Sequence, residues 1–176
     1  WAGRFDGPDT IFILSDTASV PIRLEGRLPH LVGLERGVAM VFERFNNGRS
    51  DVFYVAFDGE RVGDPVCLSS RHPLNLQPYA AMHEGRVCVG WASSPDWGLC
   101  PWVDQLRDVE MKQIDSSTGT VEDGPGTEKG LMPIRTQAGV RLKTNSFFNI
   151  TPSNLRLVSH DEKLICTYRM FDPQSN

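Results

Sequence analysis

The sequence lacks the marks of several large classes of protein. It contains no basic tract, and its formal net charge is −4. We therefore expect no nucleic-acid partner, because binding to a phosphate backbone depends on clustered Lys and Arg. The longest apolar runs, such as residues 38–42, are far shorter than the roughly 20 residues that a helix needs to cross a bilayer, so we expect no membrane span. No segment keeps an apolar period of about 3.6 residues, which argues against amphipathic helices.

Metal-binding and catalytic signatures are also missing. The four cysteines form no CxxC pair and have no histidine at zinc spacing, so we expect no metal and no cofactor. Three of them, Cys67, Cys88 and Cys166, lie in apolar runs typical of buried free thiols, whereas Cys100 lies in an expected loop. The sequence holds no GxSxG, HExxH, phosphate-binding glycine loop or EF-hand loop, so no motif names a reaction.

Glycine and proline are abundant instead. The chain has 16 glycines and 12 prolines among 176 residues, a share of about 16% against a usual value of roughly 12%. This excess indicates many turns and favours an all-β protein. The content of 40% hydrophobic and 23% charged residues is typical of a soluble, globular chain.

Two short units recur along the chain. In the first unit, two aspartates flank six residues of strand character, at 9–16, 51–58 and 108–115. In the second unit, two apolar stretches flank a tight polar turn and an aromatic residue closes the unit, at 29–42, 78–91 and 155–168. Within 87–92, large residues alternate with small ones, which predicts strands packed between two neighbours.

The order of these units predicts successive four-stranded antiparallel sheets. Units of about 40–50 residues are typical of β-propeller blades. We therefore expect an incomplete propeller of about three blades within 1–176, and the alternative is a small β-sandwich. The expected pieces are an outer half-blade at 9–24, blades at 28–68 and 76–128, and an inner half-blade at 153–170. The remaining blades of a longer chain would be a partner of this segment, since the chain starts at Trp1 and reads as a fragment or a trimmed mature chain.

The longer loops are expected at one end of the blades. In an antiparallel meander the segments 69–77, 93–107 and 129–152 fall at the same end, and insertions gathered on one face favour a binding face. Loop 93–107 offers two indoles that can stack on sugar rings, with charged residues that can orient a polar ligand. The candidate ligand-binding residues are Trp97, Trp102, Asp96, Asp104, Arg107 and, in the third loop, Arg135. Alternatively, the two tryptophans pack beneath their own loop as a small core, and the charged residues form only a solvated surface.

Four further polar residues lie near this face, and the histidine among them is a candidate acid or base. His72 can exchange a proton near neutral pH, and Arg71 precedes it. Tyr168 and Arg169 end a strand beside the same face. An exposed histidine without a role, and a tyrosine that belongs to the core, are the alternatives.

The alternating hairpin followed by an aspartate-flanked strand resembles the repeats of sialidase-like propellers and of related polysaccharide lyases. The resemblance covers about residues 9–170 and concerns architecture only. Residues 94–98 begin like the Asp-box of sialidases, but Trp102 comes one residue late for that motif. The resemblance favours an extracellular or periplasmic location, while the sequence itself leaves the compartment open. For an enzyme of the lyase type, it also implies a cation or an arginine that neutralises a uronate carboxylate, with a His or Tyr as base and acid. The candidates for these catalytic roles in this sequence are His72, Arg71, Tyr168 and Arg169.

Two functions follow as hypotheses. The first is a propeller segment that binds a carbohydrate or a protein through the long-loop face. The second is a carbohydrate-active lyase or hydrolase that uses the same face. Titratable groups that converge in a cleft would favour the enzyme.

Overall fold

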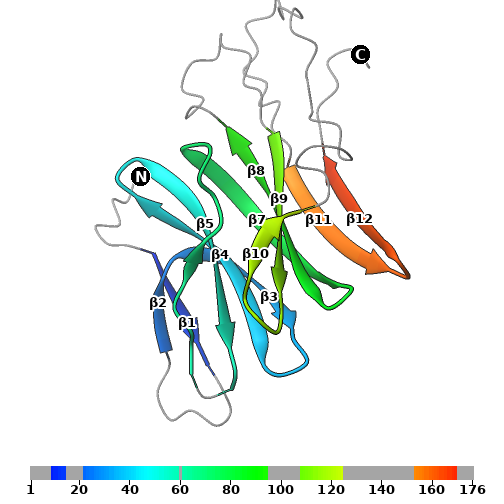
Figure 1. The fold of residues 1–176 in the computed structure, drawn as a ribbon. Coiled ribbons are helices and arrows are strands. Elements are labelled where there is room, and N and C mark those ends of the chain that lie inside the picture. The colour runs from blue at the N-terminus through cyan, green and yellow to red at the C-terminus, as the bar shows by residue number, and fades with distance from the viewer. Residues whose placement is uncertain (1–8, 15–21, 60, 95–107, 125–152, 170–176) are drawn as a thin grey trace, which may run out of the picture.

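The structure is a computed structural model that describes residues 9–14, 22–59, 61–94, 108–124 and 153–169 (Figure 1). These residues form strands and turns, and no helix occurs among them. The protein is therefore all-β, as the sequence predicts. The strands are β1 (Thr10–Ile13), β2 (Ile22–Glu25), β3 (Arg27–Gly33), β4 (Val38–Asn46), β5 (Arg49–Phe57), β6 (Val66–Cys67), β7 (Leu74–His83), β8 (Arg86–Ser94), β9 (Asp108–Asp115), β10 (Val121–Asp123), β11 (Ser153–His160) and β12 (Lys163–Arg169).

The strands form two antiparallel meanders and two separate hairpins. The first meander is β3–β4–β5–β6 and the second is β7–β8–β9–β10. A single parallel pairing, Ser50 with Leu74, links the meanders into one eight-stranded sheet. The N-terminal hairpin is β1–β2 and the C-terminal hairpin is β11–β12. Within the described ranges neither a barrel nor a ring of sheets closes, and no helix has the length and apolar character of a membrane span.

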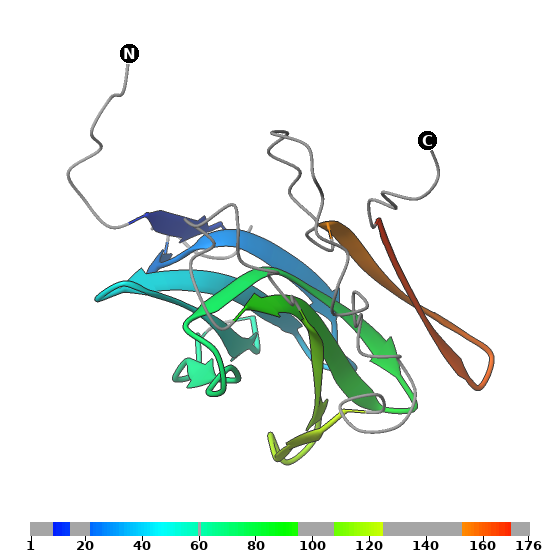
Figure 2. The same ribbon diagram turned by 90° about the horizontal axis from the view of Figure 1, so that it is seen from above.

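These four pieces lie in layers, in chain order. The N-terminal hairpin lies at one side of the molecule and the C-terminal hairpin at the other (Figures 1 and 2). Strand β7 lies between β3 and β11 and contacts both. A separate hydrophobic core fills each of the three junctions between layers. Each meander thus contributes side chains to a hydrophobic core on both of its faces.

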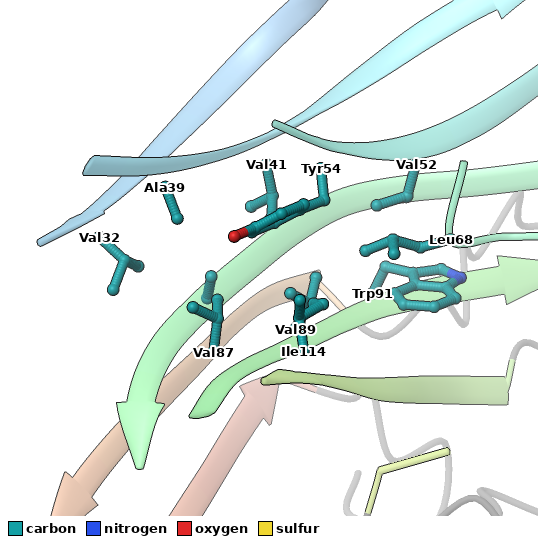
Figure 3. Close-up of a cluster of buried hydrophobic side chains, with 11 residues drawn as sticks. Val32, Ala39, Val41, Val52, Tyr54, Leu68, Val87, Val89, Trp91 and Ile114 are labelled. Atoms are coloured by element: carbon teal, nitrogen blue, oxygen red, sulfur yellow. The ribbon is translucent and has the colours of Figure 1, made fainter. Parts of the chain in front are cut away.

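Successive side chains of a strand point to opposite faces, so one strand supplies apolar side chains to two cores. On β4, Ala39 and Val41 face the second meander, whereas Met40 and Phe42 face the N-terminal hairpin. The central core, drawn in Figure 3, holds Trp91 beside Leu68. Its members, all from the two meanders and the segment after β6, are Val32, Ala39, Val41, Val52, Tyr54, Leu68, Ala80, Val87, Val89, Trp91 and Ile114.

The small face of β8 is packed as its sequence predicts. A Cβ at Gly90 would lie 3.2 Å from Leu155 Cδ2 and 3.4 Å from Leu157 Cδ1. Both leucines belong to the C-terminal hairpin and are buried in the third core. The absence of a side chain at Gly90 therefore lets this hairpin approach the second meander closely.

The three hairpins β3–β4, β7–β8 and β11–β12 have matching strand registers. Val32 lies opposite Ala39, Ala81 opposite Cys88 and Val158 opposite Ile165. Each hairpin also has a shift in register near its open end, between Arg27 and His30, Leu76 and Tyr79, and Ser153 and Arg156. The three register shifts fall at equivalent positions when 29–42, 78–91 and 155–168 are aligned.

One part of the sequence alignment is wrong by one residue. The ungapped match of 9–16 with 51–58 places Ile11 on Phe53. In the structure, Ile11 lies opposite Leu24 and faces the next layer, as Val52 does opposite Leu68. Ile11 therefore corresponds to Val52. A slip of one residue exchanges the two faces of a strand, so the flanking aspartates alone could not set this register.

The cysteines follow the prediction only in part. Cys88 is buried, Cys166 is half-buried and Cys67 is exposed, and all three are free thiols. Strand β6 is only two residues long and lies at the outer edge of the first meander, which explains the exposure of Cys67. Cys100 lies outside the described residues.

Candidate functional site

Buried polar side chains gather where the chain passes from the first meander to the second. Ser50 and Asn75 are fully buried, and Ser69 is nearly so. They lie on β5, on β7 and on the segment 68–73 that connects the meanders. A buried polar group is costly unless it is hydrogen-bonded, so the partners of each one define the local structure.

Asn75 is the centre of this polar group. Its Nδ2 donates to Ser50 O at 2.9 Å and to His72 O at 2.8 Å. Its Oδ1 accepts a hydrogen bond from Trp91 Nε1 at 3.1 Å. The Ser50 hydroxyl in turn donates to Asn75 O at 3.0 Å. Asn75 thereby joins β5, the connecting segment and β8.

Asp51 extends the polar group toward the surface. Its Oδ1 accepts hydrogen bonds from Ser69 Oγ at 3.0 Å and from Arg49 Nη2 at 3.1 Å. Ser69 Oγ also accepts from the Val52 backbone N–H at 2.9 Å. Although the Cys67 residue is exposed overall, partial desolvation of its thiol, and then the Asp51 carboxylate, raise the pKa of that thiol. A thiol held protonated is a poor nucleophile and a poor metal ligand.

His72 and Glu110 approach each other beside this group. The distance between His72 Nε2 and Glu110 Oε1 is 3.8 Å, and both side chains are largely buried. Ser93 Oγ donates to the same Glu110 oxygen at 2.8 Å. Glu110 lies opposite Trp91 in the register of β8 and β9, so its side chain faces the first meander. An imidazole, a carboxylate and a hydroxyl thus converge from three parts of the chain.

Of the candidate residues whose side chains the structure describes, His72 joins this cluster. Arg71 is exposed. Tyr168 and Arg169 end β12, but their side chains lie outside the described part of the chain. The other candidates lie entirely outside the described residues. They are Trp97, Trp102, Asp96, Asp104, Arg107 and Arg135.

The structure does locate the two ends of segment 95–107. Ser93 pairs with Asn75 on one side and with Asp108 on the other. The segment therefore leaves and re-enters the sheet next to the His72–Glu110 pair. The connection 68–73 and the two ends of segment 95–107 lie at the same end of the sheets, as the meander topology predicts. The expected loops 69–77 and 93–107 are shorter than predicted, because β7 begins at Leu74 and β8 continues to Ser94.

A second polar row follows the three neighbouring strands β3, β7 and β11. The rings of His30 and Tyr79 are 3.8 Å apart between centroids, and the Arg156 guanidinium lies 5.0 Å from the Tyr79 centroid. The Ala80 backbone N–H donates to His30 Nδ1 at 3.3 Å. Burial and then the positive charge of Arg156 lower the pKa of His30. The row therefore favours a neutral imidazole.

Glu43 is a third polar feature, and its carboxylate is fully buried. It accepts a hydrogen bond from Arg27 Nε at 2.9 Å and one from the Gln77 backbone N–H at 2.5 Å. Gln77 has a positive φ of 54° at the register shift of β7. Glu43 thus ties the first meander to the irregular start of the second.

The sequence interpretation missed Glu110, Asn75 and Glu43. Two of them carried a signal, since Glu43 follows the apolar run 38–42 and Glu110 takes the place of Phe53 in the aligned units. A charged residue at an apolar position of an alternating strand suggests a buried partner. Asn75 carried no such signal, because its partners come from packing between meanders.

No group of three or more potential metal ligands occurs among the residues that the structure describes. Comparisons with protein families, with curated proteins and with solved structures gave no match to the chain.

Proposed function

We propose that each meander is one blade of a β-propeller and that the two hairpins are half-blades. Three observations support this. The hairpins β3–β4, β7–β8 and β11–β12 share a register and a register shift. Each meander contains four antiparallel strands in sequence order, as a blade does. Three cores separate four layers, whereas a two-sheet sandwich has a single core between its sheets.

We further propose that this segment binds a carbohydrate through the sheet end that carries loops 69–77, 93–107 and 129–152. The observation that carries the proposal is the pairing of Asn75 with Ser93 and of Ser93 with Asp108. It puts the ends of the tryptophan-containing loop beside loop 69–77. The third loop re-enters at Ser153, at the start of β11, and β11 packs on β7.

The residue types at this end suit a sugar ligand. Indole rings stack on the apolar faces of sugars, and Trp97 and Trp102 lie in loop 93–107. Carboxylates, hydroxyls and imidazoles bind sugar hydroxyls, and Glu110, Ser93 and His72 supply these groups at the base of the loop. A protein ligand would use the same aromatic residues, and the experiment below separates the two.

A glycan array probed with the labelled chain tests the proposal. We expect binding to a subset of glycans, and its loss in the double variant Trp97→Ala/Trp102→Ala. The control is His160→Ala, an exposed ring at the β11–β12 turn, which should leave binding unchanged. Glycan binding that survives the double substitution would contradict the stacking role, and an array without any bound glycan would overturn the carbohydrate proposal and favour a protein ligand.

A second candidate function is a carbohydrate-active lyase or hydrolase. It is favoured by the approach of His72 to Glu110, because an imidazole and a carboxylate in one site can serve as base and acid. Incubation with uronate-containing polymers, followed by detection of new reducing ends, tests it. Turnover should vanish in His72→Ala and Glu110→Gln. Turnover that is absent from the unmodified chain at every pH tested would exclude this candidate for the chain.

A further inference from the structure

A polar side chain follows the register shift in each of the hairpins β3–β4, β7–β8 and β11–β12. The three residues are His30, Tyr79 and Arg156, and they occupy one aligned position. Their neighbours along the chain are all apolar, namely Pro29 and Leu31, Pro78 and Ala80, and Leu155 and Leu157. A bulge of this kind re-aims the side chain beside it and is frequent next to binding sites. The three polar residues are therefore candidates for a shared site.

The three side chains differ in type, although their strands match in register. A common role in packing favours one kind of side chain, as at the aligned position of Phe42 and Trp91, where an aromatic ring fills a core in both hairpins. Imidazole, phenol and guanidinium share another property, because each of them can donate hydrogen bonds. The aligned position thus differs from a packing position and provides three donors of different shape.

The fold brings these donors into one continuous row. Strand β7 contacts both β3 and β11, so Tyr79 lies between the other two residues. The centroids of the His30 and Tyr79 rings are 3.8 Å apart, and the Arg156 guanidinium carbon lies 5.0 Å from the Tyr79 centroid. Contact with an aromatic face leaves the in-plane N–H groups of a guanidinium available to a ligand. The row is therefore a single surface to which three layers contribute.

The polar atoms of the row are open to a ligand. The Ala80 backbone N–H donates to His30 Nδ1 at 3.3 Å, so the neutral ring carries its proton on Nε2. Among the described residues neither His30 Nε2 nor the Tyr79 hydroxyl has a hydrogen-bond partner, and neither atom is buried. Both rings are half-buried, and Arg156 is exposed. The donors of the row can therefore bond to a molecule from solution.

The charge of the row selects the ligand. Arg156 Nη1 donates to Leu155 O at 2.9 Å, and no carboxylate in the described part of the chain forms an ion pair with Arg156. The guanidinium is thus a positive charge without an acidic partner there. A guanidinium binds a carboxylate through two parallel hydrogen bonds. One such charge beside a neutral imidazole and a phenol matches a single carboxylate with hydroxyl groups near it.

We propose that His30, Tyr79 and Arg156 bind the carboxylate end of a hydroxylated organic acid. Arg156 pairs with the carboxylate, and the Tyr79 hydroxyl and His30 Nε2 bond to the neighbouring oxygens of the ligand. The site is formed by the contacts among β3, β7 and β11. It is separate from the carbohydrate site proposed at the loop end and does not rest on it.

An NMR titration of the His30 ring with gluconate tests the proposal. Gluconate is a hydroxylated acid, and sorbitol is its neutral counterpart, in which a hydroxymethyl group replaces the carboxylate. We expect gluconate to shift the His30 signals until they saturate, and we expect no saturable shift with sorbitol or with sodium chloride at equal ionic strength. A response to chloride equal to the response to gluconate would reduce the effect to screening of Arg156 and overturn the proposal. An equal response to sorbitol would overturn the role of the carboxylate.

Two substitutions assign the binding to the row. Arg156→Gln removes the positive charge and should weaken gluconate binding about tenfold or more. Tyr79→Phe keeps the ring that packs against the third core but removes the hydroxyl, and it should weaken binding about threefold. The control is Arg23→Gln, which removes another exposed arginine that lies over an aromatic ring, that of Phe12, and should leave the affinity unchanged. Unchanged affinity in Arg156→Gln, or an equal loss in the control, would refute the assignment.

The double variant Trp97→Ala/Trp102→Ala distinguishes this site from the loop site. It should bind gluconate as the unmodified chain does, even where it no longer binds glycans. Loss of gluconate binding in this variant would contradict a separate site. Gluconate binding by a chain that binds no glycan on the array would refute the carbohydrate proposal alone.

Discussion

Trp91 donates a 3.1 Å hydrogen bond from its indole nitrogen to the side-chain oxygen of Asn75, and both side chains are fully buried. The indole is also the largest side chain of the central core (Figure 3). The hydrogen bond therefore fixes the orientation of the residue that packs the two meanders together. Through the remaining bonds of Asn75, the same contact fixes the segment that carries His72.

Asn75→Ala should destabilise the protein strongly. The substitution leaves Trp91 Nε1, Ser50 O and His72 O without the Asn75 side chain, and unsatisfied buried polar groups cost about 1–3 kcal/mol each. We expect the free energy of unfolding to fall by roughly 3 kcal/mol or more in urea denaturation. Asn46→Ala, at an exposed position of β4, is the matched control. Similar losses for the two variants would contradict a central role for Asn75.

Gly37→Ala should cost far more than Gly48→Ala. Both glycines have a positive φ, 84° and 76°, so both variants carry a penalty of about 1–2 kcal/mol for the left-handed backbone. At Gly37 a Cβ would also lie 2.1 Å from Phe57 O, whereas at Gly48 nothing lies within 4 Å. Thermal unfolding of the two variants measures the difference. Equal melting temperatures would show that the contact of the Gly37 turn with β5 is absent.

The stability of the protein should fall as the pH drops below about 6.5. Burial and Arg156 lower the pKa of His30 from its ordinary value of 6.5. A lowered histidine pKa means that the unfolded chain takes up the proton first, so this contribution is complete above pH 6.5 and is lost as the pH falls toward the folded pKa. An NMR titration should give a His30 midpoint below 6.5.

Two substitutions separate the causes of this shift. Arg156→Gln should raise the His30 midpoint, since it removes the nearby positive charge. Arg23→Gln changes an arginine that lies over Phe12 on the N-terminal hairpin and is not among the causes of the His30 shift, so it should leave the midpoint unchanged. A His30 midpoint at or above 6.5 in the unmodified protein would refute the assignment.

The turn after β9 should weaken in strong acid. The hydroxyl of Ser117, and then the backbone N–H groups of Thr118 and Ser117, lower the pKa of Asp115 to about 2. A lowered carboxyl pKa stabilises the fold above the ordinary value of 3.8, and this contribution is lost as the pH falls toward 2. Carboxyl-carbon NMR measures the midpoint. Ser117→Ala should raise the midpoint of Asp115. Ser116→Ala is the control, because the Ser116 hydroxyl donates to Gly85 O, and it should leave the midpoint unchanged.

The sequence by itself determined the strands and most of their local pairing. Alternation with a period of two is a local property, so the order of residues alone assigns Val87, Val89 and Trp91 to one face of β8 and Gly90 to the other. The β7–β8 register follows from a tight turn, where Glu84 and Gly85 both take positive φ values of 49° and 73°. Pairing across a short turn needs no information from the rest of the chain.

The tertiary structure decided what meets across the layers. Asn75 reaches Trp91 across 16 residues and Ser50 across 25, and Glu110 approaches His72 from another strand. The one-residue correction of Ile11 and the exposure of Leu31 are likewise results of packing. Composition and spacing describe one strand and its nearest neighbour, whereas these contacts depend on how whole sheets stack, and so only the folded chain could reveal them.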